Sequence, residues 1–131
     1  MAFEWHEFLD VARFLQAEVK AKSVSAEAGC RSAIGRAYYA AFGHALGYAK
    51  AWLGFKGKSK PEEKSQEHGA LKAHLRMKKR AKAANKLDQL RTLRNLCDYE
   101  ESLDGFPFEE NLDAALSDAD YIFQSLASPT S

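Results

Sequence analysis

The longest helical pattern in the chain runs from Ala26 to Leu53, AEAGCRSAIGRAYYAAFGHALGYAKAWL. Spacing the residues about 100° apart puts larger apolar side chains on one face, namely Ile34, Tyr38, Phe42, Ala45, Ala49 and Trp52. The opposite face carries small residues, namely Ala33, Ala37, Ala40, Gly43 and Gly47. Glycine inside a helix costs stability. The small face therefore predicts that another helix approaches closely, from this chain or from a second copy.

Four more helical patterns flank this stretch. They cover residues Glu4–Lys20, a segment that begins near Glu63, and the ranges Ala84–Leu103 and Glu109–Leu126. In the third pattern, the side chains expected to face the core are His68, Leu71, Leu75 and Met77. No alternation typical of strands is present. The sequence therefore predicts one all-α domain over residues 1–131, an antiparallel bundle of four to five helices.

Breaks between these patterns carry turn-forming residues. Gly54–Gln66 is rich in Gly, Lys and Ser and contains Pro61, so we expect an exposed, mobile loop there. Asp104–Pro107 should end the fourth helix, and the tail Ser128–Ser131 should fray. Between Lys78 and Asn85 the sequence leaves open whether the chain turns or continues.

Charge is distributed unevenly, although the net charge is only +1. Residues 50–82 contain eleven Lys or Arg and three acids, whereas no Lys or Arg follows Arg94. One interpretation is that the two regions neutralise each other within the fold or across a dimer. The other is a basic surface that attracts a polyanion.

Composition also limits the setting and the chemistry. Cys30 and Cys97 lie inside helical patterns without metal-ligand spacing, which favours a reduced, cytoplasmic setting and two buried thiols. No signal peptide and no membrane-spanning stretch is apparent. We find neither Glu-x-x-His pairs nor a Gly-rich phosphate loop, so no metal and no cofactor is expected.

A polar strip borders the apolar face of the fourth pattern. It consists of Arg91, Arg94, Asn95, Asp98 and Tyr99. Arg94 and Asp98 are four residues apart and can form an ion pair on a helix. A guanidinium in such a place can also bind a phosphate through two parallel hydrogen bonds. The sequence alone leaves a structural ion pair and a binding site open.

Two motifs of this chain resemble the HEPN (higher eukaryote and prokaryote nucleotide-binding) family, over about residues 5–125. RSAIGRAYYAAFGH, residues 31–44, is similar to the second-helix signature of small prokaryotic members, and LRTLRNLCDY, residues 90–99, to their fourth-helix motif. The segment Glu67–Gly69 resembles the start of their third helix.

The resemblance implies a helical bundle that is usually a homodimer. In catalytic members an Arg and a His cleave RNA without metal, and many are toxins paired with a minimal nucleotidyltransferase antitoxin. Arg94 and Asn95 match the start of that motif, but Tyr99 stands where the His is expected. A phenol, with a reference pKa of about 10, is a poor base at neutral pH. The resemblance is therefore compatible with a binding protein and with a ribonuclease.

Three functional hypotheses follow. The first is a nucleotide- or RNA-binding protein of a toxin–antitoxin or defence system, with weak or no catalysis, whose site contains Arg94, Asn95, Asp98 and Tyr99, with Arg31, Arg36 and Arg91 as phosphate contacts. The second is a metal-independent ribonuclease, in which Arg94 stabilises charge and Tyr99 or His68 transfers protons. The third is a non-catalytic dimerisation or interaction module.

Overall fold

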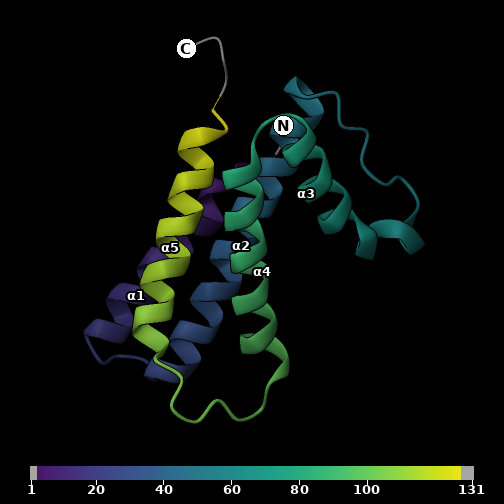
Figure 1. Ribbon diagram of the computed structural model, residues 1–131. Helices are drawn as coiled ribbons and strands as arrows, with labels where there is room; N and C mark the ends of the chain where they lie inside the picture. Colours follow the sequence, from purple (N-terminus) through teal and green to yellow (C-terminus); the bar gives the residue numbers. More distant parts are fainter. Residues whose placement is uncertain (1–2, 128–131) are drawn as a thin grey trace.

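The computed structural model describes residues 3–127, and this part of the chain contains helices and no strand (Figure 1). Its elements are α1 (His6–Lys20), α2 (Ala26–Trp52), the 3₁₀ helix η1 (Pro61–Gln66), α3 (Glu67–Met77), α4 (Ala81–Tyr99) and α5 (Phe108–Ser125). The prediction of an all-α bundle is confirmed. The expected frayed tail, residues 128–131, lies outside the described residues.

Helix α2 is the central element of the bundle. It packs against α1, α5 and α4, while α4 also packs against α5 and α3. Short connections join α1 to α2 and α4 to α5, so α1, α2, α4 and α5 alternate in direction (Figure 1). Helix α3 lies at the side of this bundle, with the segment that precedes it further out.

The core lies between α2 and its neighbours. Its largest fully buried side chains include Ile34, Leu71, Leu87, Leu90, Leu112 and Ile122. Both cysteines are free and buried, as expected of small core residues. None of the helices in residues 3–127 is long and apolar enough to cross a membrane.

The small face of α2 accommodates α1 of the same chain. A Cβ atom built on Gly43 would lie 2.1 Å from the nearest atom of the Trp5 ring. Near the start of α2, a Cβ on Gly29 would lie 2.4 Å from Val19. The close helix–helix approach predicted from the sequence therefore occurs within the chain.

Two side chains expected in the core are exposed instead. Trp52, at the last position of α2, is 47% exposed and lies on the rim of a surface cavity that it shares with Phe3 and Leu126. Met77, the last residue of α3, is 68% exposed. Helical period placed both side chains on an apolar face, but each is the last residue of its helix, where the side chain is less covered.

The boundaries of α4 differ from the predicted ones. The chain turns at Lys78–Arg80, where Lys79 has a positive φ of 64°, and α4 begins at Ala81. It ends at Tyr99 instead of Leu103, because Arg31 of α2 binds its last carbonyl groups. In the expected loop before α3, residues 61–66 form the 3₁₀ helix.

Arg31 therefore caps a helix C-terminus. Its guanidinium donates to the carbonyl oxygens of Cys97 at 2.8 Å, Glu100 at 2.7 Å and Glu101 at 3.3 Å. A cation satisfies these carbonyls and interacts favourably with the negative end of the helix dipole. Glu27, one turn earlier on α2, holds the guanidinium from the other side at 2.9 Å.

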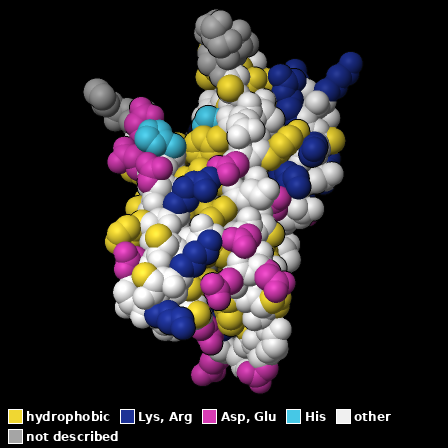
Figure 2. Space-filling model, turned by 90° about the vertical axis from the view of Figure 1, so that its left-hand side faces the viewer, with side chains coloured by type: hydrophobic (Ala, Val, Ile, Leu, Met, Phe, Trp, Pro, Cys, Tyr) yellow, Lys and Arg dark blue, Asp and Glu magenta, His cyan; other side chains and the backbone are white. Residues whose placement is uncertain are grey.

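Charge is locally balanced on the side of the bundle that α1 and α5 form. Figure 2 shows basic and acidic side chains interleaved over this face. The ion pairs include Arg13 with Asp120 and, between α4 and α5, Lys86 with Asp118 at 3.2 Å. Part of the acidic last third of the chain is thus neutralised within the fold.

Gly43→Ala tests the close approach of α1 and α2. The added methyl group overlaps the Trp5 indole, so we expect a loss of about 1–3 kcal/mol in the free energy of unfolding, measured by urea titration. Gly47→Ala on the same helix is the matched control, because nothing lies within 4 Å of its added Cβ. Higher helix propensity should make that variant neutral or more stable, by up to about 1 kcal/mol. Equal destabilisation by both substitutions would contradict the packing.

Candidate functional site

A cavity of about 330 Å³ opens between α2, the start of α3 and α4. We call it the aromatic cavity; it is lined by Tyr38, Tyr39, Phe42, Lys64, Ser65, His68, Arg91, Arg94 and Tyr99. Four residues of the predicted site thus meet here, namely Arg91, Arg94, Tyr99 and His68. The cavity combines cationic groups with several ring faces, which suits a ligand that carries both an anionic and a planar group.

Arg94 is held in place from several sides. Its Nε atom lies 2.8 Å from Asp98 Oδ2, and its terminal nitrogens donate to Tyr39 Oη at 2.6 Å and Asn95 Oδ1 at 3.1 Å. The guanidinium also lies 5.1 Å from the Tyr39 ring centroid and 5.5 Å from that of Tyr99. The ion pair expected between Arg94 and Asp98 is therefore present, and it orients a guanidinium that still lines the cavity.

Arg91, one turn earlier on α4, is in a different situation. Its side chain is half-buried and lines the same cavity. Within residues 3–127 it forms neither an ion pair nor a side-chain hydrogen bond, unlike its neighbour Arg94. A partly desolvated charge without a partner is costly. Binding of an anion would remove that cost.

His68 forms the wall of the cavity on α3. It is 4% exposed, its Nδ1 atom lies 2.9 Å from Tyr38 Oη, and its ring stacks on Phe42. Burial, and then the positive charge of Arg91, lower the pKa of His68 to about 4. Burial raises the pKa of Tyr38 to about 12. At neutral pH both groups are uncharged.

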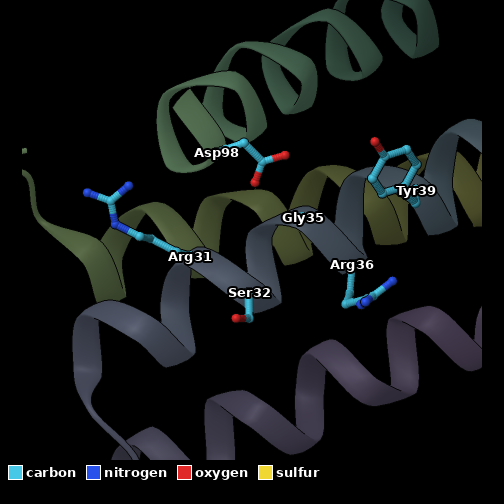
Figure 3. Close-up of a pocket in the computed structure, with 6 residues that line it drawn as sticks. All are labelled: Arg31, Ser32, Gly35, Arg36, Tyr39 and Asp98. Carbon is cyan, nitrogen blue, oxygen red and sulfur yellow. The ribbon is translucent and has the colours of Figure 1, made fainter. Parts of the chain in front are cut away.

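A second cavity of about 270 Å³ lies on the other side of Tyr39. Its lining consists of Arg31, Ser32, Gly35, Arg36, Tyr39 and Asp98 (Figure 3). The Arg31 guanidinium turns away from Asp98 toward the end of α4, and Arg36 extends on the side of α1, where it lies 5.1 Å from the Phe8 ring centroid. The structure thus separates these two predicted phosphate contacts from the aromatic cavity.

The two remaining residues of the predicted site act on Arg94. Asp98 and Asn95 both bind its guanidinium, and neither lines the aromatic cavity. Asn95 instead faces a shallow hollow that it shares with Tyr99 and Glu100. Their positions favour a role in holding the Arg94 guanidinium in place.

Several residues of the cavity were not candidates from the sequence. Lys64 and Ser65 belong to the segment expected to be a loop, and they reach the cavity because η1 packs against α3. Tyr38 was assigned to the core, and it is buried, but its ring also forms part of the cavity wall. The pairing of Tyr38 with Phe42 four residues later, beside a basic loop, is a signal that could have indicated this wall.

The other histidines have local roles. His44 Nε2 lies 2.7 Å from the carbonyl oxygen of Leu126, and His74 Nε2 lies 2.6 Å from that of Leu53. Each therefore ties a helix to the end of another element. His6 is exposed beside Glu4 and Asp10. In the described part of the chain no three His, Cys, Asp or Glu side chains are grouped so that they could hold a metal ion.

Fold and cavity together define a helical-bundle protein with a cationic, aromatic-walled cavity. Comparison of the chain with protein-family models, with curated proteins and with solved structures gives no match in any of the three.

The pKa of His68 has a consequence for stability. Because the folded pKa is about 4 and the ordinary value is 6.5, the unfolded chain binds more protons between these two pH values. The contribution of neutral His68 is complete above pH 6.5 and is lost as the pH falls toward 4. It amounts to at most about 3 kcal/mol.

We therefore expect the unfolding free energy of the wild type to fall more steeply over this pH range than that of His68→Gln. Chemical denaturation at several pH values measures the difference. Substitution of the exposed His6 by Gln serves as the control and should leave the wild-type slope unchanged. Parallel curves for wild type and His68→Gln would show that burial of this ring has no energetic consequence.

Proposed function

We propose that this protein binds a phosphate-bearing ligand, a nucleotide or RNA, in the aromatic cavity. The observation that carries the proposal is that Arg91, a partly buried residue without an ion pair or side-chain hydrogen bond within residues 3–127, lines one cavity with Arg94 and Lys64. Guanidinium groups bind phosphate through paired, charge-assisted hydrogen bonds. Three cationic side chains around one cavity favour an anion over a neutral ligand.

The rings around the cavity support a nucleotide rather than a simple anion. Tyr39 and Tyr99 are 37% and 72% exposed, and both lie against the Arg94 guanidinium. Stacking of a base on an aromatic side chain contributes about 1–3 kcal/mol. In this proposal Arg91, Arg94 and Lys64 bind phosphate, and Tyr99 and Tyr39 offer ring faces to a base.

Binding with weak or no catalysis fits the groups in the cavity. A general base works best when its pKa is near the operating pH. His68 has a pKa of about 4, and its Nδ1 atom is engaged by Tyr38. Because His68 and Arg94 line the same cavity, metal-independent ribonuclease activity is the second candidate.

The wider role follows from the resemblance of the two helix motifs to small HEPN proteins. On that basis we place the protein in a toxin–antitoxin or defence system, as a homodimer, with a minimal nucleotidyltransferase as a further partner. The paired Arg94 and Asp98 fit the alternative of a non-catalytic interaction module. The interaction module assigns no role to Arg91, which forms no ion pair within residues 3–127.

Arg91→Ala is the most direct test of the site. Since Arg91 binds no described residue, its loss should leave the fold intact and weaken binding of AMP, ATP or a labelled RNA by about tenfold to a hundredfold. Isothermal titration calorimetry or fluorescence anisotropy measures the affinity. Arg76→Gln is the control of equal charge change, because this exposed residue on α3 contacts Asn85 and lines no cavity of the proposed site. Equal affinities for wild type and Arg91→Ala would refute the proposed site.

Incubation of the purified protein with mixed RNA and a chelator separates binding from catalysis. We expect no cleavage above that of buffer, because His68, the imidazole in the cavity, has a pKa of about 4 and its Nδ1 atom is engaged by Tyr38. Cleavage that persists with chelator and disappears in Arg94→Ala would establish the ribonuclease instead.

A further inference from the structure

Three side chains from three helices form a connected series behind the aromatic cavity. Asp88 of α4 lies 3.7 Å from His68 Nε2 of α3, and His68 Nδ1 lies 2.9 Å from the hydroxyl of Tyr38 on α2. Lys72 binds Asp88 Oδ1 at 3.0 Å, and this hydrogen bond lowers the pKa of Asp88. A fixed carboxylate therefore stands at the outer end of the series.

The surroundings of His68 determine which nitrogen carries its proton. Nε2 is buried and has no hydrogen-bond partner within residues 3–127; the carboxylate of Asp88 is the acceptor beside it. The other charged groups that act on the ring, Arg91 and Lys72, can only donate. A proton on Nε2 points toward Asp88, whereas a bare lone pair there would face a negative charge. Nε2 is therefore protonated, and Nδ1 is left as an acceptor.

This tautomer fixes the role of the Tyr38 hydroxyl. A phenol has one proton, and here it is donated to His68 Nδ1. Toward any other group the Tyr38 oxygen can only accept. The positive charges of Arg91 and Arg94 both act on this phenol. Tyr38 lines the same cavity as the two arginines, so an anion bound there would meet an oxygen that accepts hydrogen bonds and repels bare oxyanions.

We propose that Asp88, His68 and Tyr38 make the aromatic cavity selective for anions that carry their own hydroxyl group beside the charge. Hydrogen phosphate satisfies this requirement with its P–OH group, and a sugar phosphate does so with a sugar hydroxyl. Sulfate has a similar shape and charge but no proton to donate. Tyr38 supplies the acceptor, and His68 and Asp88 are positioning residues. The inference rests on the proposed anion site and adds the property by which it distinguishes its ligands.

Titrations followed by NMR at about pH 8 test the selectivity, because phosphate esters, with a second pKa of about 6, are then fully ionised. We expect hydrogen phosphate to bind about tenfold more tightly than sulfate, and ribose 5-phosphate about tenfold more tightly than methyl phosphate. The first pair tests a hydroxyl on phosphorus, and the second tests one on the sugar. A preference in only one of the two pairs identifies which ligand hydroxyl donates a hydrogen bond to the Tyr38 oxygen.

Tyr38→Phe should remove the preference while each anion still binds, and Asp88→Asn should reduce it, because an amide no longer imposes one tautomer. Tyr121→Phe, on α5 and outside the cavity, loses a phenol in contact with Lys82 and should keep the preference. Equal binding within both ligand pairs by the wild type would overturn the selectivity. If Arg91→Ala still weakened binding in that case, the anion site itself would stand.

The ¹⁵N chemical shifts of the His68 ring give a second measurement that needs no ligand. We expect protonation at Nε2 in the wild type and a mixture of tautomers in Asp88→Asn. Protonation at Nδ1 in the wild type would overturn the proposed roles of Asp88, His68 and Tyr38, whatever the anion titrations show. Failure of all four anions to bind would overturn the selectivity, whereas titration with AMP, ATP or RNA decides the proposed function separately and the ring shifts decide the tautomer.

Discussion

The structure depends on α2 packing against different neighbours with different faces. One face of this helix must let α1 approach the backbone, which it does through Gly43 beneath the Trp5 indole. Another face presents Tyr38 and Phe42 toward α3 and α4, where the aromatic cavity opens. A single helix thus combines close packing against α1 with one wall of the aromatic cavity, because small residues fill one side and rings the other.

Arg91 and Arg94 show how one helix turn can separate two roles for the same side chain. Arg94 has a carboxylate, an amide and a phenol as partners, so its charge is satisfied and its position is fixed. Arg91 has no such partner within residues 3–127, so its positive charge is not neutralised by a neighbouring side chain there. The first residue shapes the cavity, and the second is the group on which the proposed anion site depends.

The sequence was sufficient to predict the helices and their packing type, because period, glycines and prolines are local signals. It could not place the end of α4, since Arg31 stops that helix through bonds to residues about seventy positions away. Tertiary contacts also divided the predicted site. Arg31 and Arg36 line the second cavity, while His68 joins Arg91 and Arg94. Helical spacing cannot reveal such a division, because it depends on which faces of α2 and α4 meet.

Helix α3 has a looser connection to the bundle than the other helices. It packs mainly on α4 and has only limited contact with α2. One wall of the cavity, including His68 and the adjoining Lys64, is therefore carried by the element that can detach with the least loss of core. Under the proposed function, ligand binding and docking of α3 are linked equilibria, because a ligand in the cavity would contact both this helix and the rest of the bundle.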